Sequence, residues 1–367
     1  MSHLKAKLTA FGRCDFGSAS CRARLAGEII RRTVAIKVRT LGRNGLQVSA
    51  LGLGCLSLTG DYGTPVPESV AKALELGITF LDTADAYSAN ANELLVGRAI
   101  RGHRNEVVLA TKFGLVNGAV GSDMFRADAA YVRSACDASL GRLGVDHIDL
   151  YYCHRVDPRV PVEETVGAMG DLVRAGKVRY LGLSEVTAET LRRAHATHPI
   201  MAIESEWSIW SRGIEGEVLP VARSLGTGIV AYAPLGRGFL TGKITEELPA
   251  FDRRQQYPRF QRDNFGRNRA WVVRLDELAR RKGCSTAQLA LAWLSAQGED
   301  VVPIPGADRP EYVEENVHAL DIDLTRDDLD QIEKLAAPGA VSGDRYANMG
   351  FVAGETPPKS TDTNPPA

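Results

Sequence analysis

The 367-residue sequence lacks a long hydrophobic run, a paired-cysteine motif and an excess of charge of either sign. Its longest uncharged stretch, residues 44–60, is too short and too rich in glycine and polar residues to be a transmembrane helix. The six cysteines are scattered, with no Cys-x-x-Cys and no zinc-type Cys/His cluster, so we expect no metal site and reduced thiols in a cytoplasmic protein. The 44 Lys and Arg residues nearly match the 45 Asp and Glu residues, which argues against a nucleic-acid partner.

The two ends of the chain differ in composition from the rest. Residues 1–36 are basic and show neither sustained periodicity nor the apolar segment of a secretory signal, so we predict a disordered extension there. A translated upstream leader or a basic targeting arm is the alternative. Residues 341–367 are predicted to be a C-terminal tail with a disordered proline-rich end, which leaves residues 37–340 as one domain.

Strand-like and helix-like segments alternate through this domain. Eight short apolar runs cover residues 50–55, 78–82, 107–111, 148–153, 179–184, 201–204, 229–232 and 301–304. Amphipathic stretches with helical spacing lie between them, and residues 38–49 predict a β-hairpin that turns at Asn44-Gly45. We therefore predict an α/β fold, a (β/α)8 TIM barrel with an N-terminal β-hairpin. A doubly wound Rossmann sheet is disfavoured because its Gly-x-Gly-x-x-Gly fingerprint is missing.

Polar residues follow three successive predicted strands, at the end of a barrel where catalytic groups usually lie. Asp82, Lys112 and His154 end these strands, and Tyr87 comes shortly after Asp82. Taken singly, each has an ordinary structural explanation, such as a helix cap for Asp82 or packing for Tyr87. Together they make a general acid: Lys112, paired with Asp82, would lower the pKa of the Tyr87 phenol, and His154 would orient a substrate oxygen.

Substrate selection is expected to depend on two connections at this mouth. These are residues 115–123 and residues 236–268, and the second is long enough to act as a lid. Phe113, Trp207 and Trp210 are candidates for an aromatic substrate pocket, with packing inside the barrel as the alternative for the tryptophans.

Several long motifs resemble those of the aldo-keto reductase family, in the family's order over about residues 37–335. They are residues 77–97 (GITFLDTADAYSANANELLVG), 107–114 (VVLATKFG), 148–158 (IDLYYCHRVDP), 176–184 (GKVRYLGLS), 229–242 (IVAYAPLGRGFLTG) and 303–316 (PIPGADRPEYVEEN). Within the family, the motifs after the fifth and sixth predicted strands are most similar to those of the auxin-induced-protein type of bacterial and plant oxidoreductases. The resemblance implies hydride transfer from a nicotinamide cofactor to an aldehyde or ketone, with a tyrosine as proton donor.

The resemblance also implies roles for individual residues. Asp82, Tyr87, Lys112 and His154 would form the catalytic tetrad, and Tyr232 would stack on the nicotinamide while Ser184 and Glu204 hold its carboxamide. The implied cofactor-binding set is Gly54, Asp82, Ser184, Glu204, Tyr232, Leu235, Gly236, Arg237, Gly306, Asp308, Arg309, Glu315 and Asn316. A cofactor-binding regulatory or sensor subunit with little turnover shares these motifs and is the alternative function.

Three positions depart from the common family pattern. Glu185 stands where many relatives have Asn, Glu204 where Gln is usual, and Asp308 where Lys is common. Glu204 keeps an acceptor for the carboxamide but loses the amide donor. Asp308 opposes the 2′-phosphate of NADPH that Arg309 attracts, so we expect NADPH to be preferred over NADH by a small margin. The physiological substrate and the oligomeric state are not predicted.

Overall fold

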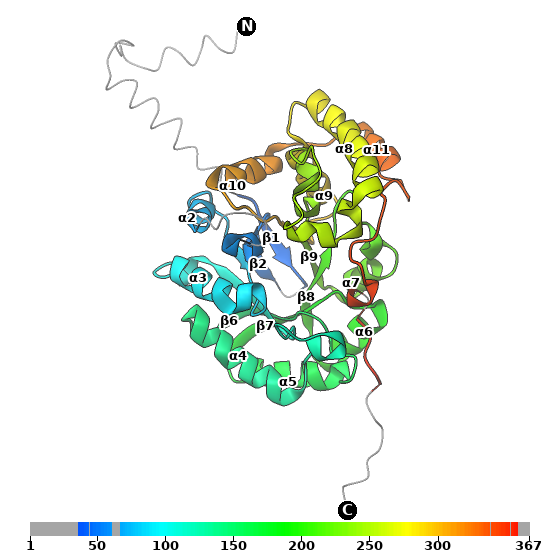
Figure 1. The fold of residues 1–367 in the computed structure, drawn as a ribbon. Helices are drawn as coiled ribbons and strands as arrows, with labels where there is room; N and C mark the ends of the chain where they lie inside the picture. Colours follow the sequence, from blue (N-terminus) through cyan, green and yellow to red (C-terminus); the bar gives the residue numbers. More distant parts are fainter. Residues whose placement is uncertain (1–35, 44, 61–66, 338, 353, 359–367) are drawn as a thin grey trace, which may run out of the picture. The chain divides into compact units, whose positions relative to one another are not determined.

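The computed structural model describes residues 36–43, 45–60, 67–337, 339–352 and 354–358. Its main sheet has eight strands in the order β10-β9-β8-β7-β6-β5-β4-β3, and every neighbouring pair is parallel (Figure 1). The strands are β3 (Leu53–Gly54), β4 (Phe80–Asp82), β5 (Val108–Phe113), β6 (Ile148–Cys153), β7 (Val178–Ser184), β8 (Ile200–Glu206), β9 (Gly228–Tyr232) and β10 (Val301–Ile304). Each lies within or beside one of the eight predicted runs, so the predicted (β/α)8 fold is confirmed.

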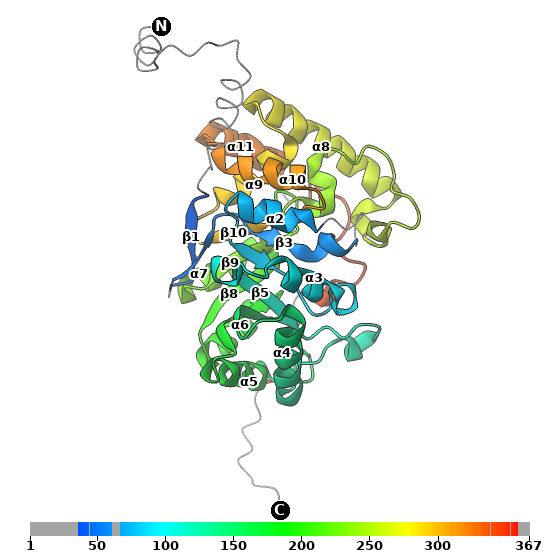
Figure 2. The same ribbon diagram turned by 90° about the vertical axis from the view of Figure 1, so that its left-hand side faces the viewer.

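The helices surround the strands and follow them in turn along the chain (Figures 1 and 2). They are α2 (Glu68–Glu75), α3 (Ala91–Ala99), α4 (Ala129–Leu143), α5 (Val162–Arg174), α6 (Ala188–Thr197), α7 (Val218–Leu225), α8 (Arg262–Lys282), α9 (Thr286–Ser295), α10 (Pro310–Val317) and α11 (Arg326–Leu335). A capping box formed by Ser285 and Gln288 begins α9. Within the described ranges, no helix combines the length and the apolar character needed to cross a membrane.

The barrel closes where β3 meets the segment that contains β10. Gly52 N donates to Pro303 O at 2.9 Å, Gly54 N donates to Pro305 O at 3.2 Å, and Gly54 forms a parallel bridge with Gly306. Neither proline has an N–H with which to donate a bond in return. We call this contact the seam; it joins the first strand of the barrel to its last.

The predicted hairpin packs against the barrel at the start of β9. Its strands are β1 (Val38–Leu41) and β2 (Leu46–Ser49), and Arg43 N donates to Gly226 O at 2.7 Å; the predicted turn residue Asn44 lies outside the described residues. Leu41, Leu46 and Val48 join the side chains of the barrel interior in one apolar cluster. Gly182 of β7 leaves room for a large interior ring, since a Cβ there would lie 2.4 Å from Tyr152.

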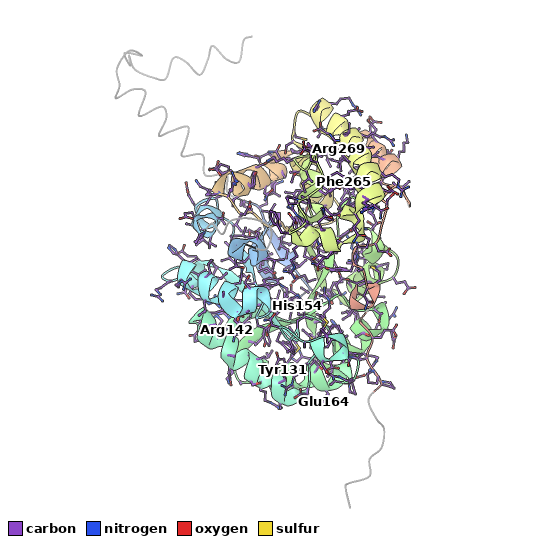
Figure 3. The ribbon with its side chains drawn as sticks, viewed as in Figure 1. Tyr131, Arg142, His154, Glu164, Phe265 and Arg269 are labelled. Carbon is purple, nitrogen blue, oxygen red and sulfur yellow. The ribbon has the colours of Figure 1, made fainter. Side chains whose placement is uncertain are left out.

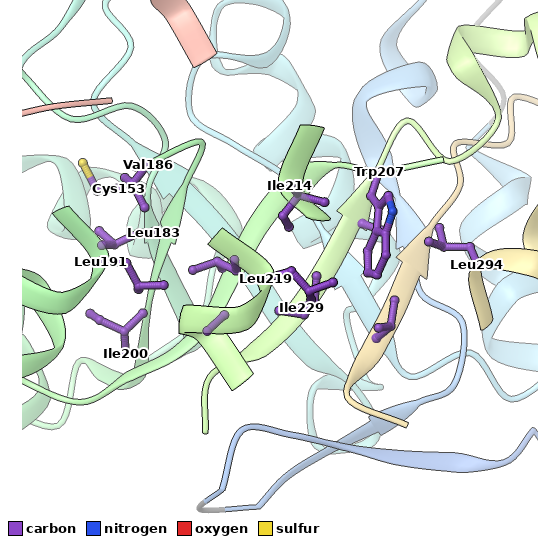
Figure 4. Close-up of a cluster of buried hydrophobic side chains, with 14 of the residues drawn as sticks. Cys153, Leu183, Val186, Leu191, Ile200, Trp207, Ile214, Leu219, Ile229 and Leu294 are labelled. Carbon is purple, nitrogen blue, oxygen red and sulfur yellow. The ribbon is translucent and has the colours of Figure 1, made fainter. Parts of the chain in front are cut away.

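The outer faces of the strands pack against the helices (Figure 4). Trp207 meets Trp293 of α9 edge to face at 6.4 Å, and Trp210 stacks on Phe239 at 4.9 Å. Phe113 stacks on Tyr151 in the same way at 4.9 Å and is fully buried. All three candidate pocket aromatics are therefore packing residues, and the alternative assignment of the tryptophans is the one the structure supports.

Two segments that the sequence predicts to be irregular carry structure. The long connection after β9 contains the 3₁₀ helices η6 (Gly236–Thr241), η7 (Arg253–Gln256) and η8 (Pro258–Phe260), and α8 begins within its predicted range. In the tail, residue Gly354 bridges to Val186, and Arg193 donates to the carbonyls of Thr356 and Pro357. The expectations for residues 1–35 and 359–367 lie outside the described residues.

Candidate active site

A cavity of about 790 Å³ opens at the carboxyl ends of the strands. Thirteen of the predicted site residues line it: Gly54, Asp82, Tyr87, His154, Ser184, Glu204, Tyr232, Leu235, Arg237, Gly306, Asp308, Glu315 and Asn316. Residues of the predicted 115–123 connection line it too, from Leu115 to Ala119. Lys112 lies fully buried beside it, while Gly236 and Arg309 are not among the lining residues.

The buried Lys112 ammonium contacts Asp82, Tyr87 and Glu204, and we call these four residues the cavity floor. Its Nζ donates to Asp82 Oδ1, to the Thr83 carbonyl at 2.9 Å and to the Tyr87 hydroxyl at 3.5 Å, and it lies 3.3 Å from Glu204 Oε2. Burial by itself lowers the pKa of Lys112, but attraction to Asp82, Glu204 and Tyr87 outweighs burial and raises it. The lysine therefore stays charged at neutral pH.

The Tyr87 hydroxyl stays protonated in this environment. Burial raises its pKa, and the attraction of Lys112, which lowers it, is the smaller effect. The sequence predicts that Lys112 lowers the pKa of Tyr87. This prediction is wrong for the protein without bound cofactor, because burial of the phenolate raises the pKa by more than the ammonium lowers it. Tyr87 begins η2 (Tyr87–Asn90), where Ser88, Ala89 and Asn90 all have left-handed backbone angles.

His154 faces Tyr87 across the cavity. The two rings meet edge to face at 5.8 Å, and Figure 3 places His154 inside the ring of helices that carry Tyr131, Arg142 and Glu164. Burial lowers the pKa of His154 well below its usual value, and the charges of Arg155 and Lys112 lower it further. The imidazole is therefore neutral, with one ring nitrogen able to donate a hydrogen bond.

Glu204, predicted to bind the cofactor, lies next to Asp82 and Lys112 of the proposed tetrad. Its side chain is nearly buried, and its carboxyl shares the Lys112 ammonium with that of Asp82. Burial raises the pKa of Glu204 to about 8, and repulsion from Asp82 acts in the same direction. Burial also raises the pKa of Asp82, which Lys112 opposes. One ammonium thus stands between two carboxyl groups.

The negative charge of Glu185, another departure from the family pattern, is balanced by Arg345 of the C-terminal tail. Its carboxylate accepts from both Nη atoms of Arg345, at 2.9 and 3.2 Å, and from the Tyr232 hydroxyl at 2.9 Å. The Tyr346 hydroxyl lies 3.1 Å from that of Tyr232. Sequence reasoning missed Arg345 and Tyr346 because the tail has no periodicity and their partners lie more than a hundred residues away.

Arg155 is another site residue that the sequence argument passed over. It is buried, lines the cavity, and donates from Nη1 to Ser184 Oγ at 2.9 Å and to the His154 carbonyl. Arg155 directly follows His154 at the end of a predicted strand, and this position alone could have marked it as a candidate site residue.

The far end of the cavity holds the predicted adenosine residues. Asp308 lines the wall, whereas Arg309 is exposed at the start of α10. Lys243 also lines this end; its Nζ lies 4.2 Å from the centre of the Tyr312 ring and donates to Glu315 at 3.0 Å. Sequence reasoning missed Lys243 and Tyr312.

The residues present fit an extended dinucleotide. Four lining residues have a buried polar atom that finds no hydrogen-bond partner among the residues the structure describes: Ser57 Oγ, Asp82 Oδ2, His154 Nδ1 and Glu204 Oε2. Two glycines allow close packing at this cavity: a Cβ on Gly54, which lines it, would lie 2.7 Å from the Ile304 carbonyl, and one on Gly236, beside the lining residue Leu235, would lie 2.6 Å from Trp210. Arg237 also has a left-handed backbone and is held by Glu206 at 2.9 Å.

Comparison with known proteins agrees with this geometry. Residues 50–337 match the aldo/keto reductase family. A probable aldo-keto reductase 1 of Glycine max is 48% identical over 332 residues, covering 88% of this chain and 96% of the relative. The chain belongs to the aldo/keto reductase family and is an oxidoreductase enzyme.

Two solved structures have the same fold. A glycerol dehydrogenase from Gluconobacter oxydans is 28% identical with a TM-score of 0.75, covering 91% of this chain and all (100%) of the other. A thermostable aldo-keto reductase solved with the inhibitor epalrestat is 29% identical with a TM-score of 0.65, covering 82% of this chain and 99% of the other. The likeness extends along nearly the whole length of both relatives.

Proposed function

We propose that this protein reduces an aldehyde or ketone to an alcohol in the cytoplasm, using NADPH as the hydride donor and Tyr87 as the general acid. The observation that carries the proposal is the buried Lys112 ammonium, bound to Asp82 and within 3.5 Å of the Tyr87 hydroxyl at the cavity floor. When bound, the nicotinamide supplies a hydride from C4. The protein supplies the proton and the environment in which both transfers occur.

Tyr87 gives its proton to the carbonyl oxygen as negative charge develops there. Burial keeps the phenol protonated before the reaction. Afterwards the phenolate lies beside Lys112, whose charge stabilises it strongly in a site shielded from water. Asp82 keeps that ammonium in place, so its contribution to the reaction acts through Lys112.

His154 orients the carbonyl oxygen. A neutral imidazole can donate one hydrogen bond without protonating the substrate, and burial together with Arg155 keeps it neutral. This arrangement leaves Tyr87 as the group that transfers a proton.

The remaining predicted residues would hold the cofactor along the cavity. Tyr232 would lie against the nicotinamide face, Ser184 and Glu204 would bind the carboxamide, and the turn of Leu235, Gly236 and Arg237 would bind the pyrophosphate. The adenosine portion would be held by Gly306, Asp308, Arg309, Glu315 and Asn316. The cavity lining described above supports this placement for all of these residues except Gly236 and Arg309, and the Arg309 guanidinium lies 6.0 Å from the ring of the lining residue Tyr312.

The test of the acid is Tyr87→Phe, which removes one hydroxyl. General acid catalysis is typically worth ~10²–10⁴-fold, so turnover of a nitrobenzaldehyde should fall by that factor while cofactor fluorescence quenching stays near normal. Tyr151→Phe is the matched control, because the Tyr151 hydroxyl is buried, has no hydrogen-bond partner among the described residues, and belongs to the packed outer face. Near-normal turnover in Tyr87→Phe would refute the assignment.

The cofactor preference follows from the charges at the adenosine end. Lys243 and Arg309 attract a 2′-phosphate, and Asp308 opposes it, so NADPH should be preferred over NADH by a small margin. Replacing Asp308 by Lys should raise the NADPH preference in kcat/KM by about tenfold or more, which corresponds to about 2 kcal/mol of exposed charge interaction. A large wild-type preference that Asp308→Lys does not change would show that this carboxylate lies away from the phosphate.

A further inference from the structure

The proposed reaction gives Glu204 a binding role but makes no use of its ability to gain or lose a proton. It lines the cavity, it is 3% exposed, and its Oε2 finds no hydrogen-bond donor among the described residues except the shared ammonium 3.3 Å away. This chain therefore has a buried proton-binding group at this point of the cavity.

The charges around Glu204 come from several elements. The titratable and charged groups that act on it or feel its charge are Asp82 from β4, Tyr87 from η2, Lys112 from β5, and Tyr152 and Arg155 at β6. Asp82 and Lys112 dominate. With both carboxyl groups ionised, the cluster of Asp82, Lys112 and Glu204 carries one net negative charge in a buried place; with Glu204 protonated it is neutral.

A buried net charge is unfavourable unless a counter-charge arrives. The nicotinamide ring offers one, because it is neutral in the reduced cofactor and positively charged in the oxidised cofactor. On the placement proposed above, Glu204 meets the carboxamide of that ring. The redox state of the ring then decides which protonation state of Glu204 is favoured.

We propose that Glu204 is a redox-sensing proton site: it holds its proton beside reduced cofactor and releases that proton to solvent when oxidised cofactor binds. This inference rests on the proposed function. It makes Glu204 a residue that selects between the two forms of the cofactor, with alkaline pH favouring the oxidised form. The affinity for the reduced form should change little with pH by comparison.

The experiment measures proton release on cofactor binding. Calorimetric titrations of the whole protein with NADP⁺ and with NADPH near pH 7.5, each in two buffers of different ionisation enthalpy, give the protons released per cofactor. The difference between the two cofactors is the readout, because ionisation of the common 2′-phosphate cancels. We expect a substantial fraction of one proton for NADP⁺ over NADPH, and an NADP⁺ affinity that rises on the order of tenfold relative to that of NADPH between pH 6 and pH 9.

Two variants assign the proton. Glu204→Gln should abolish both the difference in proton release and the pH dependence of the affinity ratio, whereas Glu204→Asp should retain them. Tyr87→Phe should leave the difference in place, which separates Glu204 from the phenol as the source. The wild-type affinity ratio alone keeps the proposal falsifiable if Glu204→Gln does not fold.

Each failure has a distinct meaning. If both cofactors bind but the proton difference is absent, or persists in Glu204→Gln, the inference about Glu204 is wrong and the proposed function stands. If neither cofactor binds the wild-type protein, the proposed function fails, and the inference fails with it.

Discussion

Removing the Arg345 guanidinium should destabilise the protein far more than its position in a tail suggests. In Arg345→Met, the nearly buried Glu185 carboxylate loses its two charged donors and keeps the Tyr232 hydroxyl and the Glu206 N–H, both at 2.9 Å. Breaking a buried ion pair typically costs about 3–5 kcal/mol. The donors that remain reduce this, and we expect a loss of about 2–3 kcal/mol.

Thermal unfolding measures that loss. With an unfolding entropy of about 2.1 cal/mol/K per residue, 1 kcal/mol shifts the melting temperature of a chain of this size by about 1.3 °C, so we expect a fall of roughly 3–4 °C. Cofactor binding should also weaken, because Tyr232 is held by Glu185. The control is Arg326→Met, which breaks an exposed pair with Asp330 at 3.0 Å and should cost under about 1 kcal/mol.

A double variant tests the cause. Adding Glu185→Gln to Arg345→Met removes the uncompensated charge, so part of the lost stability should return. If Arg345→Met melts at the temperature of Arg326→Met, or the double variant recovers nothing, the tail does not neutralise Glu185 as argued.

Two further predictions concern stability. Burial, with Glu93 acting in the same direction, raises the pKa of Asp85 to about 7, above its value of about 3.9 when unfolded, so the carboxyl destabilises the fold increasingly as pH rises between these values. Asp85→Asn should therefore melt higher than wild type at pH 8 and equally at pH 4, and an equal melting temperature at both would contradict this. Gly236→Ala places a Cβ 2.6 Å from the Trp210 ring at a φ of 56°, so it should lose about 1–3 kcal/mol in denaturant unfolding and bind cofactor less well, while Gly141→Ala on exposed α4 should lose nothing.

The barrel could be predicted because its signal is local. Each strand is a short buried run that the chain can form only in a sheet covered on both faces, and the intervening stretches have helical periodicity. The convergence of the proposed tetrad was equally accessible, since Asp82, Lys112 and His154 lie at or next to the ends of successive strands and parallel strands bring their ends to one mouth.

What could not be predicted depends on contacts between distant residues. Nothing near Arg345 in the sequence indicates Glu185, and the order of the two influences on Tyr87 depends on how completely the fold buries its hydroxyl. Likewise the sequence placed Arg309 at the adenosine end by motif, but the wall there is completed by Lys243, which lies more than sixty residues earlier.

The seam makes the barrel's first and last strands depend on one another across almost the whole domain. The amides of Gly52 and of Gly54 in β3 donate across it to Pro303 and Pro305, which have no N–H to donate in return. Contacts of such high sequence separation carry a large loop-closure cost and slow folding. Because Gly54 and Gly306 both line the cavity, a cofactor bound as we propose would contact both edges of the seam, and its binding would stabilise the closure of the barrel.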